Sequence, residues 1–346
     1  MSKKNRKVAK FLFIASSFCL LLVYLFLKED INSLQQSFGQ LNFNYIVLGF
    51  FFVIGYISCD ALSIFTLRRQ FQSKVSFLSC LKASFISIGL GLITPFTSGY
   101  LAGQITIMGK GGMSASDGAT VVLQKTIRYI LVGLIANLLL IFLNQDVFEI
   151  TLTVKIMVIA SIVGTILYLL FLSLVSKAEK PLTRISIGIV RFGHKIHLIR
   201  RIEKLENKIK EEIHLLNYRM TNHKISFGAN LITMISCLME LFLLYLVTWA
   251  LYMSFYSNSP TFTVFQIMSC QSLCNVILQV APIPGGVGIV DATFHDVMST
   301  ILGSHLNISL IIWRLLTFYF PIMMSFILMG FKNKVYKNIN NFQKPL

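Results

Sequence analysis

Long apolar runs separated by short polar segments dominate the chain. Five runs lie at about 45–65, 118–143, 153–175, 228–253 and 307–330, and a sixth lies at about 8–27, behind a basic N-terminus. Each run is long enough to cross a hydrocarbon core about 30 Å thick at a rise of about 1.5 Å per residue. The run at 8–27 is followed by Lys28-Glu29-Asp30 and has no small-residue cleavage site, so we interpret it as a signal anchor.

Two further apolar stretches, at about 76–110 and 262–304, are broken in the middle by proline and glycine. The breaks read Thr94-Pro95-Phe96-Thr97-Ser98-Gly99 and Pro282-Ile283-Pro284-Gly285-Gly286-Val287-Gly288. A broken helix exposes backbone groups that lipid cannot satisfy, so such breaks line polar cavities or are packed inside protein. We predict an all-α polytopic membrane protein with six full spans and two re-entrant hairpins. If each half of a broken stretch crossed the membrane instead, two crossings would be added at each break and the orientation of the other spans would not change.

The composition and the charge distribution fit this prediction. Apolar residues make up 55 % of the chain and charged residues 13 %, whereas soluble domains carry about 25 % charged residues. The net charge of +17 would suggest nucleic acid in a soluble protein, but Lys and Arg of membrane proteins gather in cytoplasmic loops. With the N-terminus inside, 26 of 31 basic residues are cytoplasmic, and Lys28 and Lys155 are outside. We therefore predict two cytoplasmic termini and no direct nucleic-acid partner.

The two halves of the chain match in spacing. Pro95 precedes Lys125 by 30 residues, and Pro284 precedes Arg314 by the same 30 residues. Each half contains three predicted spans, so the halves begin on opposite sides of the membrane. Paired interrupted segments in such an arrangement are typical of an inverted-topology repeat with a transporter binding site near the midplane. We predict one integral-membrane domain over 1–346, with repeat 1 at about 8–143 and repeat 2 at about 153–330.

The cytoplasmic loop 177–226 is the one sizeable segment predicted outside the membrane. Its apolar residues recur at helical spacing, and Glu206 and Lys210 can pair at i,i+4. These apolar residues are Ile202, Leu205, Ile209, Ile213 and Leu216. We expect an amphipathic helix on the inner leaflet. The alternatives for its cations are recognition of anionic lipid and a solvated, topology-determining loop.

Ionisable residues inside the predicted spans are candidates for ligand contact, because burying a charge in lipid is unfavourable. They include Glu240, Asp291, Arg314, Lys125 and Arg128. For the two residues in the third span, snorkelling to the inner surface is the alternative. For the other three, a mutual structural ion pair is the alternative. A further acid, Asp60, is interpreted as a partner for Arg68 or Arg69.

The residue types favour a ligand with both charges. Glycines after a helix break leave backbone N–H groups free for an anion, and Arg314 and Lys125 add positive charge for a phosphate. Glu240 and Asp291 suit an ammonium group. The pattern therefore indicates a zwitterionic or aminoacylated phospholipid whose head group crosses a polar cavity while its tails stay in lipid.

The breaks and the last span carry a resemblance to a known family. The first break, the proline–glycine run ending in Gly288 with Asp291 behind it, and the Arg314…Tyr319…Pro321 pattern resemble the membrane region of bacterial lysylphosphatidylglycerol synthases. That region also occurs as stand-alone flippase-like proteins. Two departures are that Gln104 stands where relatives place an acid and that Asp291 replaces the usual Glu.

The resemblance implies a flippase for lysylphosphatidylglycerol-like lipid in the bacterial cell membrane, which affects surface charge and resistance to cationic antimicrobial peptides. In longer relatives a cytosolic domain transfers lysyl from tRNA to phosphatidylglycerol. The chain stops at Leu346, so we expect no such domain. The expected partners are a membrane phospholipid and the bilayer, with a separate cytosolic synthase or a second copy as further partners.

We expect no catalytic residue, metal or cofactor, and interpret cysteines such as Cys270 and Cys274 as buried hydrophobes. The alternatives are a lysyltransferase membrane part using His295, Asp291 or Asp296 as base, a lipid-linked sugar translocator, and a scaffold acting through the 177–226 loop. The candidate substrate-binding residues are Thr94, Pro95, Ser98, Gly99, Gln104, Lys125, Arg128, Glu240, Pro284, Gly285, Gly286, Gly288, Asp291, Arg314 and Tyr319.

Overall fold

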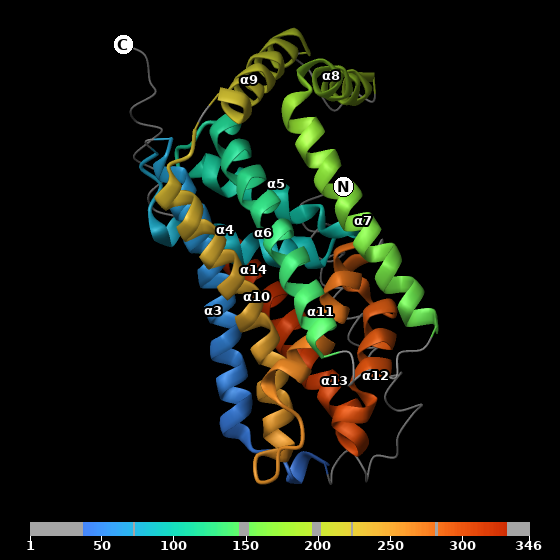
Figure 1. Cartoon of the computed structure of the whole chain (residues 1–346). Coiled ribbons are helices and arrows are strands. Elements are labelled where there is room, and N and C mark those ends of the chain that lie inside the picture. Colours follow the sequence, from blue (N-terminus) through green and yellow to red (C-terminus); the bar gives the residue numbers. More distant parts are fainter. Residues whose placement is uncertain are drawn as a thin grey trace.

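The computed structural model describes residues 37–71, 73–144, 152–195, 202–222, 224–280 and 283–330, and these are helical with short connections (Figure 1). The predicted first span at 8–27 lies outside the described residues. The α-helices are α3 (Phe43–Arg69), α4 (Phe77–Leu92), α5 (Gly99–Lys110), α6 (Ala115–Leu143), α7 (Leu152–Lys177), α8 (Glu179–Lys195), α9 (Ile202–Asn222), α10 (Phe227–Tyr256), α11 (Val264–Val280), α12 (Ile289–Leu302), α13 (Leu306–Arg314) and α14 (Phe320–Gly330).

Four described helical segments are long and apolar enough to cross a membrane: α3, α6, α10 and the 47-residue stretch Pro284–Gly330. A fifth span results if the bent pair Val158–Leu174 and Glu179–Gly188 counts as one crossing. The predicted runs at 45–65, 118–143 and 228–253 thus lie within α3, α6 and α10. The run at 307–330 is the end of the 47-residue stretch, joined to α12 by a short 3₁₀ turn at Gly303–His305.

Polar capping residues explain where three of the spanning helices begin. The side chains of Asn42, Ser114 and Ser226 each accept a hydrogen bond from a backbone N–H in the first turn of α3, α6 and α10. Such caps satisfy N–H groups that have no partner within the helix. The apolar runs therefore continue as helices directly from polar starts at the ends of the predicted spans.

Each predicted break separates two helices that pack against one another. The first unit is α4, a 3₁₀ turn at Pro95–Thr97 (η1) and α5, and the second is α11, a 3₁₀ turn at Pro284–Gly286 (η3) and α12. The two turns η1 and η3 are in contact. Two polypeptide breaks that are far apart in sequence therefore meet in space.

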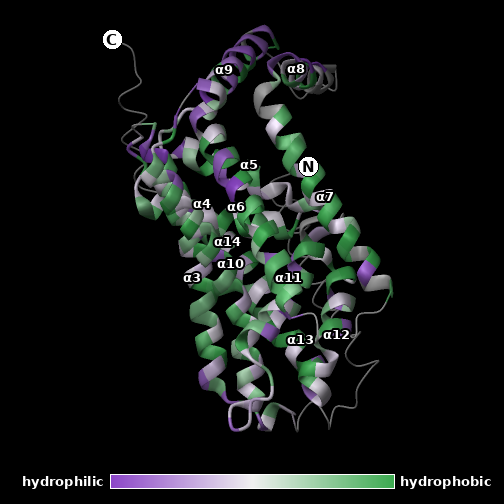
Figure 2. Cartoon of the chain, viewed as in Figure 1, coloured by the Kyte–Doolittle hydropathy of each residue, from purple (hydrophilic) through white to green (hydrophobic). Residues whose placement is uncertain are grey.

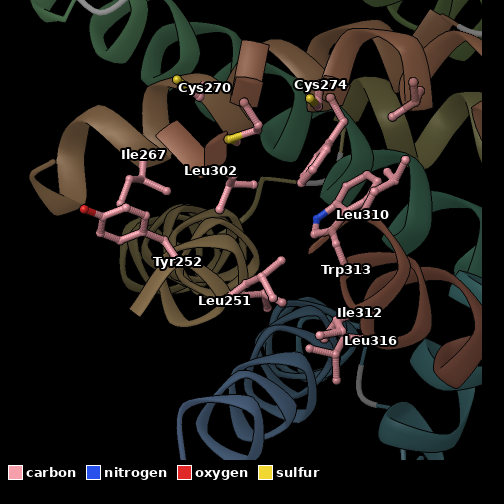
Figure 3. Close-up of a cluster of buried hydrophobic side chains, with 14 of the residues drawn as sticks. Leu251, Tyr252, Ile267, Cys270, Cys274, Leu302, Leu310, Ile312, Trp313 and Leu316 are labelled. Atoms are coloured by element: carbon pink, nitrogen blue, oxygen red, sulfur yellow. The ribbon is translucent and has the colours of Figure 1, made fainter. Parts of the chain in front are cut away.

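Contacts between the two halves follow a paired pattern. The helix α3 packs along α10, while α4 packs against α14 and α11 packs against α6. The α3–α10 pair runs along one side of the molecule in Figure 1. One large cluster of buried apolar side chains joins α10, α11, α12 and α13, and Figure 3 shows Trp313 and Cys274 in it. Cys270 and Cys274 are both buried, which agrees with their interpretation as small hydrophobes.

The outside of the bundle is apolar. Side chains such as Phe51 on α3, Phe142 on α6 and Phe171 on α7 are exposed. Figure 2 shows apolar residues along these helices and polar residues gathered at the end that carries α8 and α9. Exposed apolar surface of this extent is typical of helices that face lipid.

The loop 177–226 forms two helices, α8 and α9, rather than the single amphipathic helix expected from the sequence. Glu206 is bonded to Arg191 of α8 at 2.9 Å instead of pairing with Lys210. This hydrogen bond lowers the pKa of the Glu206 carboxyl below its usual value. The apolar residues Ile213 and Leu216 of α9 are buried in the protein, where α9 contacts α6 and α7.

Candidate functional site

One cavity of about 610 Å³ lies between the first break, α6, α7, α10, α11 and α13. Most of its lining is apolar, with side chains from Ile88, Leu244 and Val290. Three charged side chains also line it: Lys125, Glu240 and Arg314. They are almost fully buried, with residue exposures of 1 %, 6 % and 4 %. A mostly apolar cavity with a few convergent polar groups is the usual form of a small-molecule site.

The first group of charges, here called the lysine cluster, consists of Asp60, Tyr100, Gln104, Lys125 and Glu240. The ammonium of Lys125 is in an ion pair with Asp60 Oδ1, and its Nζ lies 3.1 Å from Glu240 Oε2. Lys125 also donates to the Tyr100 hydroxyl at 2.8 Å. Helices α3, α5, α6 and α10 supply these residues. The cluster therefore joins the two halves of the chain through buried charges.

Asp60 is more completely hydrogen-bonded than Glu240. The Tyr100 hydroxyl donates to Asp60 Oδ1, and Gln104 Nε2 donates to Asp60 Oδ2 at 3.0 Å. Glu240 accepts one hydrogen bond, from Lys125 to Oε1 at 3.3 Å, and its buried Oε2 accepts none. The prediction that Asp60 pairs with Arg68 or Arg69 is therefore wrong, because the carboxylate lies on the face of α3 toward Lys125.

The second group, the arginine cluster, consists of Gly285, Gly288, Asp291 and Arg314. The guanidinium of Arg314 donates from Nε to Asp291 Oδ1 at 2.5 Å and from Nη1 to the Gly285 carbonyl oxygen at 3.0 Å. The other oxygen of Asp291 accepts from the Gly288 backbone N–H at 2.8 Å. Asp291 thus orients Arg314 and caps the start of α12 at the same time.

Two buried donors at the arginine cluster have no hydrogen-bond partner in the described residues. They are Arg314 Nη2 and the indole Nε1 of Trp313. Both residues line the cavity. Buried N–H groups are normally satisfied, and an unpaired charged donor is especially unfavourable. Two residues that line the cavity therefore each carry a buried donor that the described residues leave unsatisfied.

The glycines of the second break are needed for its backbone path. Gly285 has a φ of +62°, and a Cβ there would lie 2.1 Å from Phe318 Cε2. Gly286 also has a φ of +62°, and a Cβ there would lie 2.4 Å from Val290 Cγ2. Only glycine fits both the left-handed conformation and the close approach. The proline–glycine run thus brings the Gly285 carbonyl within reach of Arg314.

The first break reaches a similar turn with other residues. Phe96 and Thr97 have positive φ values of 52° and 50°, which are uncommon outside glycine. The Thr94 hydroxyl accepts from the Gly99 N–H at 2.8 Å and donates to the Leu90 carbonyl at 2.9 Å. A Cβ at Gly99 would lie 2.5 Å from that carbonyl oxygen. Thr94 and Gly99 therefore shape the turn rather than line the cavity.

The structure separates the sequence-predicted residues into three sets. Lys125, Glu240 and Arg314 line the cavity. The residues that position the lining or the turns are Thr94, Gly99, Gln104, Gly285, Gly286, Gly288 and Asp291. The remaining residues, Pro95, Ser98, Arg128, Pro284 and Tyr319, lie outside the lining.

Arg128 and Tyr319 are occupied by other contacts. Arg128 donates to Asn230 Oδ1 at 2.6 Å and to Gln124 Oε1 at 2.5 Å, so it ties α6 to α10 instead of snorkelling. Tyr319 packs edge-to-face on Phe318 at the end of a π-helical turn, Leu315–Tyr319. A mutual ion pair of Glu240, Asp291 and Arg314 was the alternative to ligand contact. The structure shows the pair of Arg314 with Asp291, whereas Glu240 pairs with Lys125.

Several polar lining residues were not predicted from the sequence. Tyr100, Tyr129, Asn275 and Trp313 line the cavity, and the Lys125 ammonium lies 4.5 Å from the Tyr129 ring centroid. Asn275 donates to the buried Tyr245 hydroxyl at 2.9 Å. Two of these residues could have been found from their positions relative to the predicted charges. Tyr129 follows Lys125 by one helical turn, and Trp313 is next to Arg314 in the sequence.

Comparison with known families gives one match, and it covers most of the chain. The family described as "Lysylphosphatidylglycerol synthase TM region" matches residues 8–325. The match includes both breaks, the lysine cluster and the arginine cluster. No curated protein matches the chain.

Proposed function

Because the chain belongs to the family of lysylphosphatidylglycerol synthase transmembrane regions, we propose that it moves an anionic or aminoacylated phospholipid across the bacterial cytoplasmic membrane. The observation that carries this proposal is a single cavity lined by Arg314 and by Lys125 with Glu240. A head group that carries both a phosphate and an ammonium has a complementary group for each charge. The acyl chains stay in the surrounding lipid.

The phosphate is assigned to the arginine cluster. Arg314 and Trp313 line the cavity and each carries a buried donor without a partner among the described residues, Nη2 and Nε1, and guanidinium–phosphate bonds are charge-assisted. Lys125 was also a candidate for the phosphate, but its ammonium already contacts Asp60 and Glu240. Lys125 therefore holds the carboxylates in place, and Arg314 carries the anion contact.

The ammonium group is assigned to Glu240. Glu240 lines the cavity, and its buried Oε2 accepts no hydrogen bond. The rings of Tyr100 and Tyr129, which already lie near the Lys125 ammonium, also line the cavity and present faces that attract cations. A lysyl head group satisfies both the Glu240 carboxylate and these rings. Lysylphosphatidylglycerol is therefore the first lipid to test.

The inverted-topology repeat, with repeat 1 at about 8–143 and repeat 2 at about 153–330, is part of the proposal. Its support is the paired contact pattern, because α4 on α14 corresponds to α11 on α6 when the halves are exchanged. The turns η1 and η3 are equivalent in this exchange and touch each other. In such a repeat, rocking of one half against the other opens the central site to alternate sides. We also propose that both chain termini are cytoplasmic, because this orientation places 26 of the 31 basic residues on the inner side.

A lysyltransferase function receives less support from the cavity. A transferase needs a general base within hydrogen-bond reach of its acceptor. The candidate bases His295, Asp291 and Asp296 do not line the cavity, and Asp291 is bonded to Arg314. Among the described lining residues Glu240 is the one carboxylate, and it contacts Lys125.

The test is lipid movement in proteoliposomes that contain the purified chain. Fluorescent lysylphosphatidylglycerol, phosphatidylglycerol or a lipid-linked sugar is placed in both leaflets, and the outer leaflet is quenched chemically. We expect a faster second phase of quenching for the lysyl lipid, lost in Arg314→Gln. Arg128→Gln is the matched control, because Arg128 is a half-buried arginine of α6 outside the cavity.

Two results decide the proposal. Movement that requires Arg314 but not Arg128 supports it, and the lipid that moves fastest identifies the substrate. Quenching equal to that of protein-free vesicles for every lipid, from chain that elutes as a folded species, overturns it. In cells we expect a transported lysyl lipid to make the outer surface more positive and to raise resistance to cationic peptides.

A further inference from the structure

The lysine cluster contains one more negative group than positive groups. Asp60 and Glu240 are both placed against a single cation, Lys125. The side chains are 0 %, 8 % and 2 % exposed, in the same order. An uncompensated charge in a buried environment is strongly unfavourable. One additional positive charge is therefore needed to balance the cluster.

The groups that surround Glu240 do not supply this charge. The other titratable groups with electrostatic interactions in the cluster are Tyr56 and Cys59 on α3, Cys80 on α4, Tyr100 on α5, Tyr129 on α6 and Cys237 on α10. All six are tyrosines or cysteines, which are neutral at physiological pH in their ordinary state. The other cation of α6, Arg128, donates its bonds to Asn230 and Gln124.

The two carboxylates are not equivalent. Asp60 receives hydrogen bonds from Tyr100 and Gln104 in addition to its ion pair with Lys125. Glu240 receives one hydrogen bond at 3.3 Å, and its Oε2 receives none. Glu240 also lines the cavity, whereas Asp60 does not. Glu240 is therefore the carboxylate with fewer hydrogen bonds and the one whose residue lines the cavity.

We propose that Glu240 carries a proton while the cavity is empty and releases it when the cationic group of a lipid head group enters. The O–H bond of the carboxylic acid breaks, the proton passes to water in the cavity, and the resulting carboxylate pairs with the ammonium. The total charge of the cluster is the same before and after. The exchange step rests on the proposed lipid transport, and it couples lipid movement to proton movement in the opposite direction.

Infrared difference spectroscopy tests the proton on Glu240 without any lipid substrate. The full chain is measured in detergent at neutral pH, where a protonated carboxylic acid has a carbonyl stretch distinct from the bands of ionised carboxylates. We expect this band in the native protein and its loss in Glu240→Gln. We also expect its loss in Asp60→Asn, because Glu240 then faces Lys125 alone and ionises.

Asp291→Asn is the matched control. Asp291 has its own cation in Arg314, to which it is bonded at 2.5 Å, and also accepts from the Gly288 N–H. Because Asp291 is paired with a cation of its own, we expect this variant to keep the carbonyl band. If the native protein shows no such band, or if Asp60→Asn retains it, the proton assignment is wrong.

A second measurement tests the coupling. A pH-sensitive dye is enclosed in proteoliposomes with lysylphosphatidylglycerol, and proton flux is recorded while lipid moves. We expect lipid movement to drive a proton flux that is lost in Glu240→Gln. Lipid movement without proton flux overturns the coupling and leaves the transport function intact. A carbonyl band in chain that moves no lipid instead overturns the transport function and leaves the protonation of Glu240 standing.

Discussion

The two halves place a cation 30 residues after the proline of a broken helix, but they neutralise it in different ways. Arg314 has one carboxylate, Asp291, and the carbonyl oxygen of Gly285. Lys125 has two carboxylates, Asp60 and Glu240. The arginine cluster is therefore balanced in charge and keeps a spare donor for an anion. The lysine cluster has an excess carboxylate for a cation.

The difference shows how one repeated framework can bind a ligand with two charges. Each break joins two half-helices, and the two breaks meet where η1 contacts η3. The cation that follows each break is paired with one carboxylate at Arg314 and with two at Lys125. The number of carboxylates therefore determines which charge a ligand must bring to that side of the cavity. We infer that the repeated part of the sequence builds the cavity and that its asymmetry selects the head group.

The backbone of the two breaks differs as well, and the largest predicted effect tests this difference. Gly285→Val adds a side chain where a Cβ already meets Phe318 at 2.1 Å, at a φ of +62°. Because overpacking and backbone strain add together, we expect the free energy of unfolding to fall by more than about 4 kcal/mol, which leaves little folded protein. Gel filtration of the detergent extract measures the yield.

Gly288→Ala provides the control for this substitution. Gly288 has a φ of +86°, and no atom lies within 4 Å of its added Cβ. The change therefore adds backbone strain of about 1–3 kcal/mol without a steric clash. Equal yields of the two variants would contradict the packing argument.

Removing one carboxylate from each cluster tests the charge balance. Asp291→Asn leaves the buried Arg314 without an anion, a change that costs about 3–5 kcal/mol. Asp60→Asn leaves Lys125 with Glu240, so we expect a clearly smaller loss of stability. Thermal unfolding of the two variants in the same detergent measures the difference. A larger loss for Asp60→Asn would contradict the assignment of the excess charge.

Asparagine at the strained positions is predicted to have opposite effects in the two breaks. Thr97 is a β-branched residue at a φ of +50°, so Thr97→Asn relieves strain and stabilises the protein by about 1 kcal/mol. Gly286→Asn destabilises it, because Val290 Cγ2 lies 2.4 Å from the added Cβ. Melting temperatures measure both changes. A stabilising Gly286→Asn would show that the turns are not built as described.

The smallest predicted effect concerns α9, which lies outside the predicted spans and contacts the start of α6. Arg219 of α9 pairs with Asp117 at the start of α6 at 2.7 Å, with both side chains partly exposed. We expect Arg219→Ala to cost about 0.2–1 kcal/mol, because solvent screens such pairs. Lipid movement is expected to stay at the native rate. A transport defect equal to that of Arg314→Gln would show that the cavity depends on this contact.

The sequence predicts the framework better than the contacts. The positions of both breaks and three of the spans follow from apolar runs and from proline and glycine, because local backbone chemistry determines them. The same local chemistry did not identify Asp60, whose partner Lys125 is 65 residues away. The pairing of carboxylates with cations depends on how each helix is rotated about its axis when the helices pack. The spacing of residues along the chain does not predict that rotation.

The two-helix form of α8 and α9 shows the same limit. The apolar spacing of Ile209, Ile213 and Leu216 predicts a helix, and α9 is one. It does not tell whether the apolar face meets lipid or protein. The structure buries part of that face against α6 and α7, because α9 turns back over the helix ends.

The head-group preference of lipid movement tests the central claim most directly. Rates for lysylphosphatidylglycerol and phosphatidylglycerol are measured side by side in proteoliposomes of the native chain and of Glu240→Gln. The two lipids share a phosphate and differ in the ammonium groups. We predict that the native chain moves the lysyl lipid faster and that Glu240→Gln loses this preference. An unchanged ratio of the two rates in the variant would contradict the assignment of the ammonium to the lysine cluster.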